Sequence, residues 1–237
     1  MKAKFTLFAL LLFALGCSKS NAPAPSAICL ISQIERISGS NTLTTTFEYD
    51  TENKLIKFRR GSDTYEYIWE SGFVKSVQLN GSKIEDWIYS NGKLSQIGTE
   101  VTINSNGQPT ELYGNIYTYG SNGNVLTETC KGCTAIYYQY SDYDTNPNPY
   151  KILAASVNLS FFPVGNTEGG GGPIATQFLG RSGCAYANNN HRQRSESTGS
   201  PRSRVYTYNA KGQVTSIIES VSGGVETTYS ITYLNCD

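Results

Sequence analysis

Apolar and polar residues alternate over most of the chain, in short runs that end at turns containing glycine or asparagine. The clearest copies are YTYGSNGNVL at 117–126 and YTYNAKGQVTSI at 206–217, in which two rings spaced two residues apart precede a glycine. Residues two apart lie on the same face of a β-strand, and glycine readily adopts the positive φ of a tight turn. Each copy therefore predicts a β-hairpin with one apolar face.

Four looser copies precede these two: FEYDTENKL at 47–55, YIWESGFV at 67–74, WIYSNGKL at 87–94 and VTINSNGQP at 101–109. From Asn53 to Gly123 their turn residues fall 19, 20, 15 and 16 residues apart, which fits a strand, a turn, a return strand and a second turn. Second turns stand near Gly61 and at Asn80-Gly81. We expect an all-β domain, an antiparallel up-and-down meander of about 12–14 short strands that curls into a half or closed barrel.

The return strands contain one irregularity. Apolar residues follow the turn at a spacing of three, as with Leu55 and Phe58 or Val74 and Val77, and this spacing places them on opposite faces of a regular strand. Either each return strand contains a β-bulge or both faces of the sheet are covered. Pro109 stands where an apolar strand residue is expected, which predicts an edge or a bulge there.

Residues 130–204 interrupt the repeats. We expect strands at AIYYQYSDY (135–143), ILAASVNLSFF (152–162) and IATQFL (174–179), with loops at NTEGGGGP (166–173) and ANNNHRQRSESTGSPRS (187–203). The second loop is polar and has no apolar anchor, so we expect a mobile hairpin tip or a disordered insertion. Its arginines, with one just beyond it, are expected to be solvated; contact with an anionic glycan or lipid headgroup is the alternative. They are Arg192, Arg194, Arg202 and Arg204.

The N-terminus has the pattern of an export signal. Lys2 and Lys4 precede an apolar run over 5–15, which is about half the roughly 20 residues of a membrane-spanning helix. The following FALGC resembles a bacterial lipobox, although leucine stands one place later than in the strict pattern. We predict a lipoprotein signal peptide at 1–16, lipidation of Cys17, a flexible tether at 17–27 and a single β-domain at 28–237. Ser18 after the cysteine resembles lipoproteins that are sent to the outer membrane. No acidic cluster of the kind that signals surface export follows the cysteine, so we expect the periplasmic face.

The segments FEYDTENKLIKF, FALGC and DYDTNPNPYKIL together resemble known bacterial sequences. The first is similar to the tyrosine–aspartate (YD/RHS-like) repeats of wall-associated and toxin-shell proteins. The combination resembles a family of Gram-negative envelope lipoproteins of unknown function with a porin-like fold. This resemblance covers about residues 28–237 and implies a porin-like barrel, but it implies no activity.

Charge and residue usage narrow the function classes. Without residues 1–16 the chain has 17 basic and 19 acidic side chains, which gives no electrostatic case for binding nucleic acid. A single histidine and the absence of a nucleophile elbow or P-loop argue against an enzyme, and we expect no catalytic residue, cofactor or metal. Carboxylates that a glycosidase would need exist, but as charges on the repeats they are expected to face solvent. They are Glu66, Glu70, Glu85 and Asp86.

Five cysteines other than Cys17 suit disulfides in an oxidising envelope. Cys130 and Cys133 enclose a tight turn, and Cys29 with Cys236 would join the first and last strands, but Cys184 competes for either partner. A redox pair in CKGC lacks the expected βαβ context. Zinc binding by Cys130, Cys133, Cys184 and His191 is a further alternative, since the ligand types fit but the spacing does not.

The sequence favours a lipid-anchored envelope domain with a binding or structural role, with a glycan or an envelope protein as partner. Trp69, Trp87 and Tyr89 are the first candidates for stacking on sugar rings, and the competing interpretation places these rings in the core. An integral outer-membrane barrel or pore is the alternative function. Its strands would need an apolar lipid-facing band, and charges such as Glu48 and Lys57 interrupt the runs.

Overall fold

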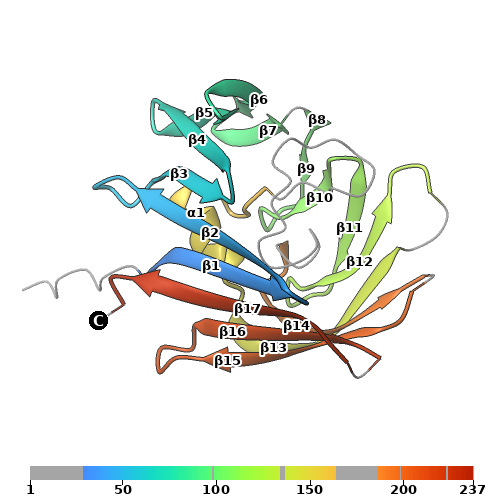
Figure 1. Cartoon of the computed structure of the whole chain (residues 1–237). Helices are drawn as coiled ribbons and strands as arrows, with labels where there is room; N and C mark the ends of the chain where they lie inside the picture. The colour runs from blue at the N-terminus through green and yellow to red at the C-terminus, as the bar shows by residue number, and fades with distance from the viewer. Residues whose placement is uncertain are drawn as a thin grey trace, which may run out of the picture.

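The computed structural model describes residues 29–97, 99–133, 137–163, 186–197, 199–222 and 224–236. They form seventeen β-strands and one short helix (Figure 1). The strands are β1 (Leu30–Ser38), β2 (Asn41–Tyr49), β3 (Leu55–Arg60), β4 (Asp63–Glu70), β5 (Phe73–Leu79), β6 (Ser82–Ser90), β7 (Lys93–Ile97), β8 (Thr99–Glu100), β9 (Thr102–Ile103), β10 (Pro109–Leu112), β11 (Asn115–Tyr119), β12 (Val125–Cys130), β13 (Tyr138–Pro147), β14 (Asn189–Glu196), β15 (Arg202–Tyr208), β16 (Val214–Val221) and β17 (Gly224–Leu234). The helix is α1 (Tyr150–Ser156).

The strands form an antiparallel meander that curls into a nearly closed barrel. Each strand pairs with the next along the chain from β1 to β8, and again from β9 to β17. The last strand then pairs with the first, with Ile34 opposite Ile231 (Figure 1). The predicted all-β meander is confirmed. Seventeen strands exceed the expected number, in part because the strand predicted before the turn at Gly107 is divided into β8 and β9 and because β14 forms where a loop was expected.

A β-bulge in each return strand explains the spacing of three between apolar residues. Tyr49 pairs with Leu55 while Glu48 pairs with Lys57, so Ile56 is the extra residue. Leu55 and Phe58 consequently both point inward and are buried. The same register shift occurs in four further hairpins, at the second aromatic residue of the repeat. The pairs are Trp69–Val74, Tyr89–Leu94, Tyr119–Val125 and Tyr208–Val214. Pro109 stands at another such shift, opposite Ile103, as predicted.

The second ring of the repeat connects one hairpin to the next. The Trp69 Nε1 donates a hydrogen bond of 2.9 Å to the carbonyl oxygen of Leu55, the residue at the bulge of the preceding hairpin. Tyr233 donates to the Val214 carbonyl at 2.7 Å in the same way, and so do Tyr119 to Pro109 and Tyr143 to Val125. Carbonyl groups inside a protein need a partner. The recurring rings therefore satisfy a backbone carbonyl at four of these bulges.

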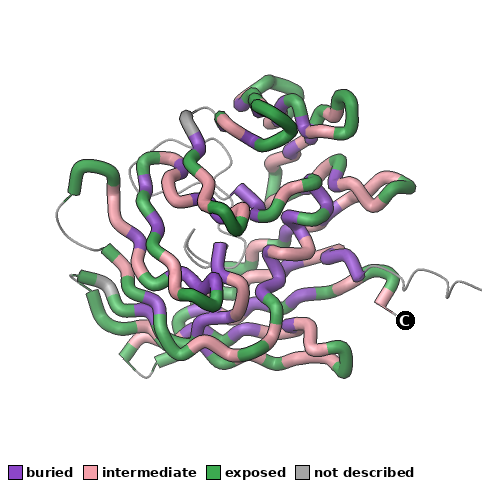
Figure 2. Tube along the Cα trace, turned by 180° about the vertical axis from the view of Figure 1, so that it is seen from behind, coloured by how far each residue is buried: buried purple, intermediate pink, exposed green. Residues whose placement is uncertain are grey.

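The barrel interior is filled by the inward side chains of the strands and by α1 with the described residues near it. Strand residues alternate between buried and exposed (Figure 2). The inward ones join a single apolar cluster with α1 and the residues that follow it. Tyr150, Leu153, Val157, Phe161, Phe162 and Tyr186 are each at most 2% exposed. The core is thus the barrel interior itself, capped and packed by α1.

The prediction of a strand at 152–162 is wrong. Residues 150–156 form α1 instead, and Phe161 and Phe162 lie in the irregular segment after it. The helix begins after Pro149, where the Asn148 side-chain oxygen accepts a hydrogen bond of 3.0 Å from the Tyr150 amide. Periodicity does not separate a buried helix from a buried strand in a short apolar run. Packing of Tyr150, Leu153 and Ala154 into the barrel interior stabilises the helix instead.

The prediction of a mobile or disordered segment at 187–203 is also wrong for the described residues. They include β14, which pairs with β13, with Tyr140 opposite Arg194 and Tyr143 opposite His191. His191 is 2% exposed, and its imidazole meets the Tyr140 ring edge to face at a centroid distance of 5.1 Å. Contacts between its polar side chains and tyrosines therefore stabilise this strand. A search for apolar alternation does not detect such a strand.

Several predicted features lie outside the described residues: the signal peptide, Cys17, the tether at 17–27, the glycine loop at 166–173, the strand at 174–179 and Cys184. Within the described ranges, no helix has the length and apolar character to cross a membrane.

Candidate functional site

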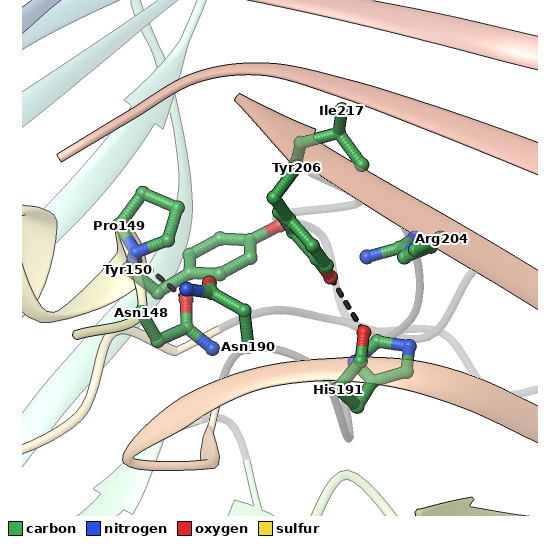
Figure 3. A pocket seen from close by; sticks show the side chains of 8 residues that line it. All are labelled: Asn148, Pro149, Tyr150, Asn190, His191, Arg204, Tyr206 and Ile217. Atoms are coloured by element: carbon green, nitrogen blue, oxygen red, sulfur yellow. Dashed lines mark hydrogen bonds between the residues drawn. The ribbon is translucent and has the colours of Figure 1, made fainter. Parts of the chain in front are cut away.

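Three features of the barrel are candidates for function: a buried charged cluster, a buried carboxyl group and a groove at one rim. The charged cluster surrounds a cavity of about 10 Å³, lined by Asn148, Pro149, Tyr150, Asn190, His191, Arg204, Tyr206 and Ile217 (Figure 3). Its volume is about that of one water probe. The Tyr206 hydroxyl points at the backbone of His191 and donates to its carbonyl oxygen at 2.7 Å. The cavity is therefore a packing feature too small for an organic ligand.

A buried ion pair between Arg204 and Glu219 lies beside this cavity. The Arg204 Nε donates to Glu219 Oε2 at 2.7 Å, and the Nη2 of the same guanidinium lies 2.6 Å from that oxygen. Burial alone would raise the pKa of Glu219, but Arg204, Arg194 and Arg202 outweigh it and lower the pKa to about 2. The pKa of His191 falls well below its usual range because of burial and the same two inner arginines, Arg204 and Arg194. The histidine is thus neutral and enclosed.

The expectation that the four arginines are solvated is wrong for two of them. Arg194 and Arg204 are 3% and 5% exposed and point into the barrel, because β14 and β15 place alternate residues on the inner face. Arg192 lies on the exposed face of β14, and Arg202 pairs with Glu219 and Glu226. They do not form a continuous cationic surface.

Glu85 is the one candidate carboxylate that departs from a solvent-facing position. It is 4% exposed, and its two oxygens accept hydrogen bonds from Trp87 Nε1 at 3.0 Å and the Tyr113 hydroxyl at 2.8 Å. Burial raises its pKa to about 7, against the smaller opposing effect of these two donors. The other candidates face outward in ion pairs: Glu66 with Lys57 at 3.0 Å, Glu70 with Lys75 at 2.5 Å and Asp86 with Lys83 at 2.8 Å.

The three rings predicted to bind sugar point into the barrel rather than out from a sheet face. Trp87 is 4% exposed and bonds to Glu85, so it is a core residue and does not stack on a ligand at the surface. Trp69 and Tyr89 pack against the core but remain partly exposed near one rim. Lys54 Nζ lies 5.4 Å from the Trp69 ring centroid, and the Phe73 ring lies 4.8 Å from that of Tyr89.

The rim near these two rings is hollowed. We call it the groove rim; it comprises the turns at Asn53, Gly72, Gly92 and Gly107 together with α1 and the residues that follow. One cavity, of about 590 Å³, is lined by Cys29, Leu30, Glu52, Asn53, Lys54, Gly72, Lys151, Ile152, Ala155, Ser156 and Asn158. Another, of about 370 Å³, is lined by Gly92, Lys93, Leu94, Ile103, Asn104, Ser105, Asn106, Gly107, Asn158, Leu159, Ser160 and Phe161. Both volumes are typical of sites for small molecules.

Two contacts fix the segment after α1 between these cavities. The Asn158 side-chain amide donates to the Gly72 carbonyl at 3.3 Å, which ties the end of the helix to the β4–β5 turn. The Ser160 hydroxyl donates to the Gly107 carbonyl. A Cβ at Gly107 would lie 2.8 Å from the Ser160 oxygen, and φ there is +77°, so this turn requires glycine. The segment thus lies between the two cavities, and Asn158 lines both.

The cysteines lie in two separate places. Cys29 is bonded to Cys236, which joins the start of β1 to the end of β17, and Cys130 is bonded to Cys133 across the turn after β12. His191 lies inside the barrel among tyrosines. Among the described residues no three His, Cys, Asp or Glu side chains gather in a way that would hold a metal ion.

The sequence contains no signal for the groove rim. Its walls come from four hairpin turns, the start of β1, and α1 with the residues after it, and Cys29 and Asn158 in the larger cavity are 129 residues apart in the chain. Each contributing segment looks like an ordinary turn or an apolar run. Only the curvature of the sheet and the position of α1 bring them together.

The chain was also compared with known proteins. No protein-family model and no curated relative matches it. Among solved structures, it is similar to a porin-like protein from Bacteroides uniformis, with a TM-score of 0.53 and 13% identity over 90% of this chain and 99% of the other. A porin-like protein from Bacteroides vulgatus aligns over 86% of this chain and 98% of the other with a TM-score of 0.43 and 9% identity. The first similarity shows the porin-like fold, and it is consistent with the predicted resemblance on this point.

Proposed function

We propose that this protein is a lipid-anchored binding module of the bacterial cell envelope, held at the periplasmic face of the outer membrane. The observation that carries the binding role is the groove rim, a concave surface on a barrel whose described inward residues form an apolar core. The lipobox-like FALGC and the porin-like structural neighbour from a Gram-negative bacterium support the address.

The residues on the outer wall of the barrel favour a domain that is surrounded by water over one that spans the membrane. Outward positions of neighbouring strands carry ion pairs, such as Arg59 with Glu48 at 3.1 Å and Lys57 with Glu66 at 3.0 Å. Charges on the lipid-facing side of a spanning barrel cost several kcal/mol near the bilayer centre. Exposed aliphatic residues, such as Ile68 and Ile88, are interspersed with Thr, Ser, Glu and Lys.

The anchor is tested by replacing residues 1–17 with a cleavable signal peptide that ends before Ser18. A lipid-anchored domain is then recovered from the periplasm without detergent, and labelling with a clickable fatty acid is lost. Retention of the variant in the outer membrane would instead support the spanning barrel or pore.

A sugar is the ligand class that the smaller cavity favours. The Asn106 amide and the Ser105 hydroxyl line it and suit hydrogen bonding to sugar hydroxyls. The side chains of Asn104, Asn158 and Ser160 also line it and are held in place by hydrogen bonds to the backbone. Tyr89 and Trp69 stand near the same rim, so their predicted role at a glycan site is retained as part of this proposal, without Trp87. A glycan array probed with the full chain and with Asn106→Ala tests it, since binding that is unchanged in the variant would exclude this cavity.

We propose binding rather than catalysis. The histidine is enclosed and neutral, and the carboxylates Glu66, Glu70 and Asp86 lie on the outer wall in ion pairs. Glu85 has a pKa suited to proton transfer, but it is buried inside the barrel, and both of its oxygens accept hydrogen bonds, from Trp87 and Tyr113. An envelope protein is the alternative partner to the glycan. This lipid-anchored protein, used as bait, would isolate such a partner.

A further inference from the structure

The larger cavity of the groove rim differs in chemistry from the amide-rich one. Leu30, Ile152 and Ala155 contribute apolar side chains to its lining. Ala155 lies on the exposed face of α1, although neighbouring helix residues such as Leu153 and Ala154 are buried in the core. A concave apolar surface of this size offers a place for a hydrocarbon chain rather than for a sugar.

Two lysines at this cavity differ in how their charge is balanced. Lys54 forms an ion pair with Glu52. Lys151 makes one hydrogen bond, of 3.5 Å, from its Nζ to the Ser160 carbonyl oxygen, and no carboxylate pairs with it among the described residues. Burial lowers the pKa of Lys151. An ammonium group that is partly desolvated beside an apolar surface is stabilised by an anion.

We propose that this cavity binds a free long-chain fatty acid, with the acyl chain against Leu30, Ile152 and Ala155 and the carboxylate beside Lys151. The charge on the cavity residues is net positive, with two lysines and one glutamate, so the anionic head and the apolar tail are both complemented. A neutral lipid would leave the Lys151 charge uncompensated.

The position of the cavity is consistent with a ligand drawn from a membrane. Cys29, the first described residue, lines the cavity and lies twelve residues after Cys17. Twelve extended residues span at most about 40 Å. If Cys17 carries lipid, as proposed above, the groove rim is kept within that distance of the bilayer. The source of the fatty acid rests on the proposed anchor, whereas the affinity of the cavity does not.

The test uses the full chain in nanodiscs of phosphatidylcholine, irradiated with a palmitate analogue that carries a diazirine. We expect covalent label on the peptides that contain Leu30 and residues 151–158. Lys151→Met should reduce labelling about tenfold or more, because it removes the charge-assisted contact. Ala155→Trp should abolish labelling by filling the cavity while leaving the core side of α1 unchanged. The matched alcohol analogue, which lacks the carboxylate, should label much less.

Lys83→Met is the control, since Lys83 lies on the outer wall in an ion pair with Asp86. Its labelling should equal that of the unchanged protein, and thermal unfolding of each variant shows whether it is folded. The proposal is overturned if the two cavity variants label as strongly as the control, if the alcohol labels equally well, or if the label falls on the outer wall. Failure of the lipid anchor is read separately, from the loss of fatty-acid labelling at Cys17.

Discussion

Glu85 shows how a single side chain makes the barrel sensitive to pH. Its folded pKa, about 7, lies above the ordinary value of 4.5, so between these values the folded state holds a proton that the unfolded state has lost. The stabilisation is complete below about pH 4.5 and is lost as pH rises to about 7. Over this window the effect amounts to about 3 kcal/mol.

Glu85→Gln should remove this dependence. Urea unfolding between pH 4.5 and 8 should show that the unfolding free energy of the variant, relative to the unchanged protein, rises with pH up to about 7 and then stays level. Glu70→Gln, at an exposed ion pair, is the matched control and should show no such trend. A difference that is independent of pH would mean that Glu85 is charged in the folded protein.

Glu219 changes the unfolding free energy with pH in the opposite direction to Glu85. Its pKa of about 2 means that its contribution is present above about pH 4.5 and is lost as pH falls toward 2. Glu219→Gln should destabilise the protein at pH 7 by about 3–5 kcal/mol, because the buried Arg204 loses its carboxylate. Urea unfolding measures this value. Glu226→Gln, whose carboxylate also pairs with Arg202 but is 40% exposed, should cost less than about 1 kcal/mol; equal losses would contradict the assignment.

At the level of the strands, the bulge and the ring that follows it form one unit. Tyr233→Phe should remove the hydrogen bond to the Val214 carbonyl and leave that oxygen unsatisfied, at a cost of about 1–3 kcal/mol. Equilibrium unfolding measures the loss, with Tyr137→Phe, at a 40% exposed position, as the control. Equal stability of Tyr233→Phe and the unchanged protein would show that water replaces the ring as donor.

For the whole molecule, closure depends on joining residues at the two ends of the domain. The Cys29–Cys236 bond links residues 207 apart beside the β1–β17 pairing. Replacing both cysteines with serine should lower the unfolding free energy by about 2–4 kcal/mol through the greater freedom of the unfolded chain. The paired replacement at Cys130 and Cys133, which are 3 residues apart, should cost less. Denaturant unfolding without reductant compares the two; the reverse order would indicate that closure does not rely on the long-range bond.

Local patterns account for the part of the structure that the sequence predicted. The alternation, the ring pairs and the turn residues from Asn53 to Gly212 each act within a few residues, and they yielded the strands and the antiparallel order. The spacing of Leu55 and Phe58 pointed to a bulge or to coverage of both faces, and it took the pairing with β2 to decide for the bulge.

Contacts between distant segments determined the features of the structure that the sequence did not predict. The pairing of β1 with β17, the helix in place of a strand at 150–156, and the burial of His191 and Arg204 all depend on partners far along the chain. The groove rim belongs to the same class, because Leu30, Gly72 and Ala155 meet only after the sheet has curled. A periodic pattern records which side of a strand is apolar, but it contains no information on which remote surface will cover that side.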